Sequence, residues 1–135
     1  MRQATPRWLH LAALVPALAI GCAERESARE QGHPGGENLA GRLDAAKGIR
    51  NVTEKDEALA MLVQAAADAG NVEITDQALA EMRDVGTKDK AAYSAAIRLA
   101  KAGKTAAATA TANVIRDVTT RDRTLAKIAK GDTSE

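Results

Sequence analysis

The chain has 135 residues, with 19 Lys and Arg against 18 Asp and Glu, so its formal net charge is only +1. A balance this even gives no overall electrostatic attraction for nucleic acid or acidic substrates. Trp8 and Tyr93 are the only aromatic residues apart from His, which argues against an aromatic stacking surface for single-stranded nucleic acid or sugars. A single Cys excludes an internal disulfide and a zinc site built from Cys ligands. The length allows one small domain with terminal extensions.

Residues 1–21 have the three-part plan of an export signal. Arg2 and Arg7 give a positively charged start, and residues 9–20 form a mostly apolar run of 12 residues. As a helix this run would extend about 18 Å, well short of the roughly 30 Å hydrocarbon core of a bilayer. We therefore expect a signal peptide rather than a membrane span.

The segment Leu18-Ala19-Ile20-Gly21-Cys22 resembles the lipobox of bacterial lipoproteins. The resemblance implies cleavage between Gly21 and Cys22 and attachment of diacylglycerol to the Cys22 sulfur. The family usually carries Leu where this chain has Ala19. The alternative is ordinary cleavage after the A-x-A site Ala17-Leu18-Ala19, which would leave a free thiol.

A lipidated Cys22 would place the protein in the bacterial cell envelope, facing the periplasm or the surface. One acyl chain holds a protein only marginally on a membrane, whereas two or three chains hold it for long times. In lipoproteins of the enteric type an Asp after the Cys signals retention in the inner membrane. Ala23 stands at that position here, so the resemblance favours the outer membrane.

Residues 22–38 are expected to form a flexible tether behind the lipidated Cys. They contain no Leu, Ile, Val or Phe and include Gly32, Pro34, Gly35 and Gly36. Such a segment cannot bury enough apolar surface to offset the entropy of ordering. His33 lies in this segment without other metal-ligating residues around it, so we expect a solvated side chain, with metal binding as the alternative.

The remainder of the chain is a repeat with a period of 33 residues. The period relates Asp56, Asp89 and Asp122 to one another, and it also relates Gly70 to Gly103. It also relates three four-residue segments: Ile-Arg-Asn-Val at 49–52, Met-Arg-Asp-Val at 82–85 and Ile-Arg-Asp-Val at 115–118. Self-similarity at this period is typical of helical arrays.

Apolar residues at helical spacing predict two helices in each unit. The expected helices cover 57–69 and 72–85, then 90–102 and 106–118, with a leading half-unit over 39–52 and a trailing half-unit over 123–130. Thr53, Thr87 and Thr120 are the expected N-caps. Connections of two to five residues favour antiparallel neighbours. The sequence therefore predicts an all-α fold, a short α-solenoid of about six helices over 39–131, followed by a disordered tail over 132–135.

The period and the Gly between the paired helices make the unit similar to tetratricopeptide-type repeats, although that family's Trp and Tyr positions and its Pro are absent. The resemblance implies a groove, lined by the first helix of each unit, that binds an extended peptide or a partner helix. It makes Tyr93, Arg98 and Lys101 candidate partner-binding residues.

No catalytic constellation is evident. A Ser or Cys triad needs a His, and His33 is the only one after the signal segment. The sequence has no phosphate loop, EF-hand or zinc-protease motif, so we expect no metal site and no cofactor. We expect Asp56 and Glu57 to lie on a solvated face at a helix start, where acids favour the helix dipole.

Three Arg residues, each followed by Asn or Asp, recur at the repeat period. They are Arg50, Arg83 and Arg116. We expect them to be structural, bonding between adjacent units or closing helix ends, with ligand recognition as the alternative.

Two functional hypotheses follow, and an enzyme is the least favoured third. The first is a membrane-anchored lipoprotein whose repeat domain is an interaction module for another envelope protein. The alternative is a structural lipoprotein spacer whose repeats self-associate without a specific ligand groove.

Overall fold

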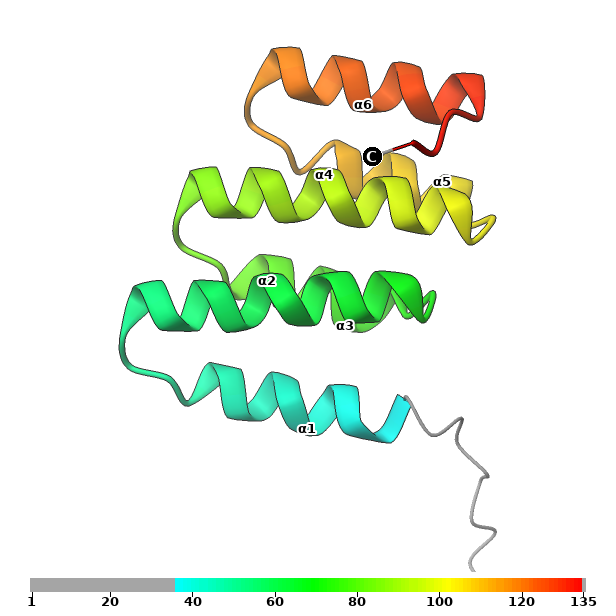
Figure 1. Ribbon diagram of the computed structural model, residues 1–135. Coiled ribbons are helices and arrows are strands. Elements are labelled where there is room, and N and C mark those ends of the chain that lie inside the picture. The colour runs from blue at the N-terminus through cyan, green and yellow to red at the C-terminus, as the bar shows by residue number, and fades with distance from the viewer. Residues whose placement is uncertain (1–35, 135) are drawn as a thin grey trace, which may run out of the picture.

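The computed structural model describes residues 36–134, which form six helices and no strand. The helices are α1 (Gly36–Lys47), α2 (Val52–Asp68), α3 (Val72–Glu81), α4 (Val85–Lys101), α5 (Thr105–Ala112) and α6 (Val118–Lys130) (Figure 1). The expected signal peptide, the lipidated Cys22 and most of the tether, including His33, lie outside the described residues.

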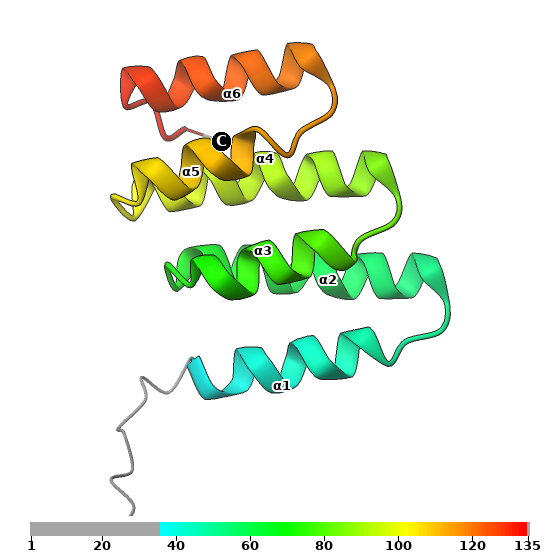
Figure 2. The same cartoon turned by 180° about the vertical axis from the view of Figure 1, so that it is seen from behind.

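The helices stack as antiparallel neighbours in a short α-solenoid, as the repeat predicts. In one view α2 and α4 lie in front of α3 and α5, and the order reverses when the molecule is turned (Figures 1 and 2). α1 and α6 stand at the two ends of the stack. The connections are three to five residues long, which confirms the expected short turns.

The longer helices begin five residues earlier than predicted, because their N-caps are not the expected Thr residues. The caps are Asn51, Asp84 and Asp117, the Asn or Asp of each repeated Arg-Asn/Asp-Val segment. The Asn51 Oδ1 atom accepts a hydrogen bond from the Thr53 amide at 3.0 Å. A short side-chain acceptor at this position satisfies an amide that the first helical turn leaves free. The expected caps Thr53, Thr87 and Thr120 therefore lie inside the helices.

The shorter helices end earlier than predicted, since the apolar residue after each one is buried without being helical. Met82 follows α3 with extended backbone angles, φ −71° and ψ 137°, and is only 5% exposed. Ile115, its equivalent after α5, is 1% exposed. Met82 and Ile115 continue the apolar periodicity of α3 and α5, although the backbone is no longer helical at either residue. Periodicity alone therefore placed the ends of these two helices too late.

Gly70 and Gly103 close the first helix of each unit, as predicted. Both have positive φ, 66° and 75°, a conformation that favours glycine. The Gly70 amide donates to Ala67 O and the Asn71 amide to Ala66 O, the paired hydrogen bonds of a Schellman motif. The same pair of bonds closes α4 around Gly103.

The core is narrow and rich in small residues. Half of the buried residues in the main apolar cluster are Ala, and the largest fully buried side chains include Leu59, Leu62 and Leu79. Small side chains let the helices approach closely, at the cost of apolar area buried per residue.

The last described residues turn back toward α6, although we expected a disordered tail. The Ser134 amide and hydroxyl both donate to Asp132 Oδ1, at 3.1 and 2.6 Å, and these bonds lower the pKa of Asp132. The Lys127 ammonium donates to the Ser134 carbonyl at 2.6 Å.

Candidate functional site

Two of the repeated Asp residues join neighbouring units of the stack. Each of the two binds main-chain amides of the linker, the short segment that leads into the next long helix. Asp56, on α2, accepts hydrogen bonds from the amide of Arg83 at 3.2 Å and the amide of Asp84 at 2.7 Å. Asp89 does the same for Arg116 and Asp117, at 3.0 Å each. The expectation of a solvated Asp56 is therefore wrong: the residue is 2% exposed, and main-chain amides of the next unit replace its water.

The residues held in this way begin the next helix. Asp84 accepts hydrogen bonds from the Thr87 hydroxyl and amide, at 2.7 and 2.8 Å, and these bonds lower its pKa. Hydrogen bonds from Thr120 lower the pKa of Asp117 in the same way. The segments that precede α4 and α6 thus donate amide hydrogen bonds to the Asp of the preceding unit and cap the helix that follows them.

The recurring Arg residues act in this contact through their main chain. The amides of Arg83 and Arg116 are the donors to Asp56 and Asp89, whereas both side chains are exposed. The prediction that these segments link units and close helix ends is confirmed at Arg83 and Arg116, for the main chain and for the Asp that follows. At Arg50 only the second part holds, because Asn51 caps α2. The guanidinium groups contribute to neither contact.

Tyr93 lines a hollow of about 330 Å³ between the starts of α4 and α6. Its ring is half-buried, and the Lys127 ammonium donates to its hydroxyl at 3.2 Å, lying 5.9 Å from the ring centroid. Asp89, Lys90 and Asp117 also line this hollow.

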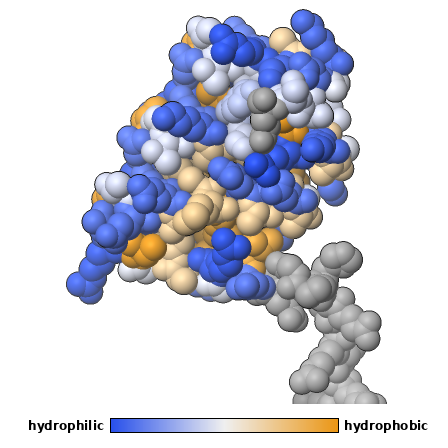
Figure 3. Space-filling view, in the orientation of Figure 1, coloured by the Kyte–Doolittle hydropathy of each residue, from blue (hydrophilic) through white to orange (hydrophobic). Residues whose placement is uncertain are grey.

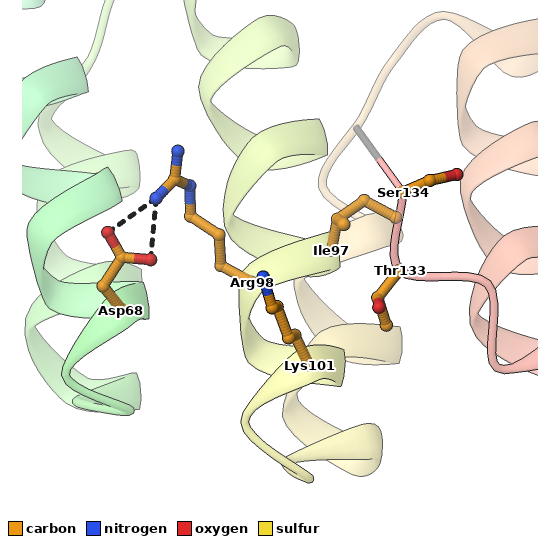
Figure 4. A pocket seen from close by; sticks show the side chains of 6 residues that line it. All are labelled: Asp68, Ile97, Arg98, Lys101, Thr133 and Ser134. Atoms are coloured by element: carbon orange, nitrogen blue, oxygen red, sulfur yellow. Dashed lines mark hydrogen bonds and ion pairs between the residues drawn. The ribbon is translucent and has the colours of Figure 1, made fainter.

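Arg98 and Lys101 line a second hollow of about 270 Å³, nearer the end of α4 (Figure 4). The Arg98 Nη1 atom donates to both carboxylate oxygens of Asp68 on α2, at 2.7 and 2.6 Å. Lys101 is exposed beside it, and Thr133 and Ser134 form the opposite wall.

The structure therefore brings two of the three candidate residues together and places the third in the neighbouring hollow. Tyr93 and the hollow of Arg98 are connected through Lys127, which donates both to the Tyr93 hydroxyl and to the Ser134 carbonyl. Sequence reasoning missed Lys127. Its only signal is its place on the trailing half-unit, one residue beyond Ala126, which is the repeat equivalent of Tyr93.

The chemistry of this surface suits binding of polar peptide groups. Arg98 and Lys101 can donate to carboxylate or carbonyl oxygens, and the Tyr93 ring can contact an apolar side chain or a cation. Within residues 36–134, no group of three His, Cys, Asp or Glu side chains lies close enough to hold a metal ion.

Comparison with protein-family models, with curated proteins and with solved structures gave no match. None of the helices over residues 36–134 combines the length and the apolar character needed to cross a bilayer.

Proposed function

We propose that the protein is a lipoprotein of the bacterial envelope, anchored through an acylated Cys22, whose helical repeats form an interaction module for another envelope protein. The observation that carries the anchor is the position of the single Cys, which follows an apolar run of signal-peptide length with only Gly21 between them. The acyl chains attached to the Cys22 sulfur would keep the repeat domain close to the membrane.

The α4 surface supports the second half of the proposal. Arg98 and Lys101 present cationic groups beside one hollow, and Tyr93 presents an amphipathic ring in the next. Arg98 is held in place by Asp68, so its position is set before any partner arrives. Since Asp68 already pairs with Arg98, Lys101 is the cation of this hollow that matches a carboxylate side chain of an extended partner segment.

The anchor is tested by replacing Cys22 with Ala in the full chain. We expect loss of labelling with a clickable fatty acid and release of the protein from the membrane fraction. Ala19→Leu, which introduces the residue more usual in a lipobox, is the matched control and should keep full labelling. Labelling of the Cys22→Ala chain at the wild-type level would contradict the anchor.

The interaction surface is tested by site-specific photo-crosslinking in cells. A photo-reactive residue at Lys101 should give a defined adduct with another envelope protein, because this exposed side chain borders the hollow. The same residue at Lys47, exposed at the end of α1, is the control and should not give that adduct. Absence of the adduct at position 101, or equal adducts at both positions, would contradict the proposed surface.

The alternative, a self-associating spacer, is favoured by one observation. Met61, on α2, is 63% exposed beside α1, which leaves a large apolar side chain on the surface at one end of the stack.

A further inference from the structure

We infer that copies of this protein stack end to end, with α6 of one copy packed into the hollow between α1 and α2 of the next. The contact would continue the 33-residue repeat from one chain into the other. The inference names the two faces of a self-association and does not depend on the anchor or on the α4 surface.

The first half of the contact is an unused carboxylate on α6. Asp122 is the third member of the series that begins with Asp56 and Asp89, both of which hold a following linker. Within the described residues no linker follows it; its side chain is 66% exposed and makes only an ion pair with Arg121 at 3.5 Å. This carboxylate has the position of a linker acceptor and no linker to hold.

The face around Asp122 also has the character of an inner helix. Leu125 and Ala129 lie two units after Leu59 and Val63, which are both fully buried. On α6, Leu125 is half-buried and Ala129 is exposed. The end of the stack therefore presents the apolar positions that other units cover.

The second half of the contact is an unused pair of amides at the other end. The linker at 49–52 repeats the segments at 82–85 and 115–118, but no Asp stands one unit before Asp56 to hold it; that position is Ala23. Among residues 36–134, the amides of Arg50 and Asn51 find no acceptor. They are the equivalents of the Arg83 and Asp84 amides that Asp56 binds.

A hollow of about 240 Å³ lies next to this free linker, between α1 and α2. It is lined by Arg42, Ala45, Ala46, Ala58, Met61 and Leu62. An apolar patch covers this lower part of the surface, where α1 adjoins α2 (Figure 3). The small apolar lining is the kind that the inner helices use to approach one another closely.

One unit further along the chain, the equivalent positions are covered. Ala78, Leu79 and Ala91, which correspond to Ala45, Ala46 and Ala58, are all less than 4% exposed. In the inner units a helix of the α2 type lies against these positions. The hollow between α1 and α2 is therefore the place where a further helix of the α2 type would pack at the α1 end of the stack.

The register of the repeat makes α6 the matching helix. Asp56 precedes the Arg83 amide that it binds by 27 residues. By the same spacing, the linker that Asp122 would bind lies 27 residues after it. That position corresponds to Arg50 after three whole repeats. A second copy placed in this register offers its Arg50 and Asn51 amides where Asp122 needs them.

The sequence that precedes α1 in the same chain matches this hollow poorly. The positions one unit before Leu59, Leu62 and Val63 are Glu26, Arg29 and Glu30. Burying these three charges in an apolar seat without partners would be costly. The same positions in α6 are Leu125, Ile128 and Ala129, so a second copy is the occupant that fits.

The test uses two variants of the full chain that each remove one face. Asp122→Lys removes the acceptor on α6, and Met61→Lys places a charge in the hollow, at a position where the third unit already carries Lys127. Glu57→Lys is the control, because Glu57 is exposed and its equivalents are Lys90 and Arg123. The chains are purified from membranes in detergent at fewer than one chain per micelle, and sedimentation velocity is measured over a concentration series.

We expect wild type and Glu57→Lys to form species that grow with concentration, since a heterologous contact leaves a free face on every assembly. Each of the two face variants alone should raise the apparent dissociation constant at least tenfold. Asp122→Lys loses a hydrogen-bonded carboxylate, and Met61→Lys would bury a charge without a partner. An equimolar mixture of the two should form a dimer and nothing larger, because only one intact face of each kind remains.

Three results would overturn the inference: a monomeric wild type at all concentrations, association of Met61→Lys alone as strong as wild type, or a mixture that stays monomeric. Circular dichroism verifies that the variants fold, and Asp122→Ala, which also removes the acceptor, replaces any Asp122→Lys sample that does not. The Cys22→Ala chain is run in parallel: unchanged stacking together with lost membrane attachment would separate this contact from the proposed anchor.

Discussion

Asp56 and Asp122 occupy the same position in their units, yet one is a core residue and the other a surface residue. Asp56 is 2% exposed and holds two amides of the next linker, whereas the Asp122 side chain is 66% exposed and holds none. The sequence around them follows the same plan. The difference shows that burial in this fold is decided by the neighbouring unit, as expected for an array in which each unit contacts only the adjacent ones.

The largest test of this comparison uses Leu59 and its equivalent Leu125. Leu59→Ala removes a fully buried side chain and should lower the free energy of unfolding by about 2–5 kcal/mol. Leu125→Ala should cost less than about 2 kcal/mol, since half-buried side chains lose less contact. Urea unfolding followed by circular dichroism at low protein concentration measures both, and equal losses would contradict the dependence on neighbours.

The paired carboxylates give the next largest effect. Asp56→Ala leaves two amides of the following linker without an acceptor and should cost about 1–3 kcal/mol. Asp122→Ala should change the free energy of unfolding by no more than about 0.5 kcal/mol in the monomer. Asp56→Asn keeps one acceptor oxygen and should fall between them; an Asp122 effect as large as that of Asp56 would remove the distinction.

A smaller effect separates the observed caps from the expected ones. Asn51→Ala should cost about 1 kcal/mol, because it removes the acceptor for the Thr53 amide, whereas Asn51→Asp should keep it. Thr53→Ala should change stability by only a few tenths of a kcal/mol, since its side chain has no capping role. The same urea measurement decides, and a larger loss at Thr53 than at Asn51 would contradict the cap assignment.

The smallest effect is a dependence on pH at the starts of α4 and α6. Hydrogen bonds lower the pKa of Asp84 and Asp117 from the ordinary value of 3.8, so their contribution is complete above that value and is lost as the pH falls below it. α2 has the uncharged cap Asn51 and should not share this dependence. Asp84→Asn with Asp117→Asn should flatten the fall in unfolding free energy below pH 3.8; an unchanged slope would contradict these caps.

Much of the fold could be predicted from the sequence because residues that join the units recur at the repeat period. The period of Asp56, Asp89 and Asp122 and the Gly at 70 and 103 predicted the helical pairs and their turns. The ends of the shorter helices could not be placed, because the buried Met82 continues the apolar pattern through an extended segment.

The candidate surface was predicted less well. The resemblance to tetratricopeptide-type repeats pointed to α4, and Arg98 and Lys101 do share a hollow. The ion pair between Arg98 and Asp68 joins residues 30 positions apart, and the contact of Lys127 with Tyr93 joins residues 34 apart. Contacts between residues so far apart in the sequence depend on how one unit is rotated relative to the next. The spacing of residue types along the chain does not give that rotation.

The bond from a carboxylate to main-chain amides has a consequence for how such a protein can evolve. Asp56 and Asp89 accept hydrogen bonds from main-chain N–H groups, which every amino acid except proline has. The contact therefore tolerates almost any side chain in the linker. Whole modules could then be duplicated or deleted in multiples of the period without redesigning a joint, and molecules of different lengths could arise from one ancestral building block.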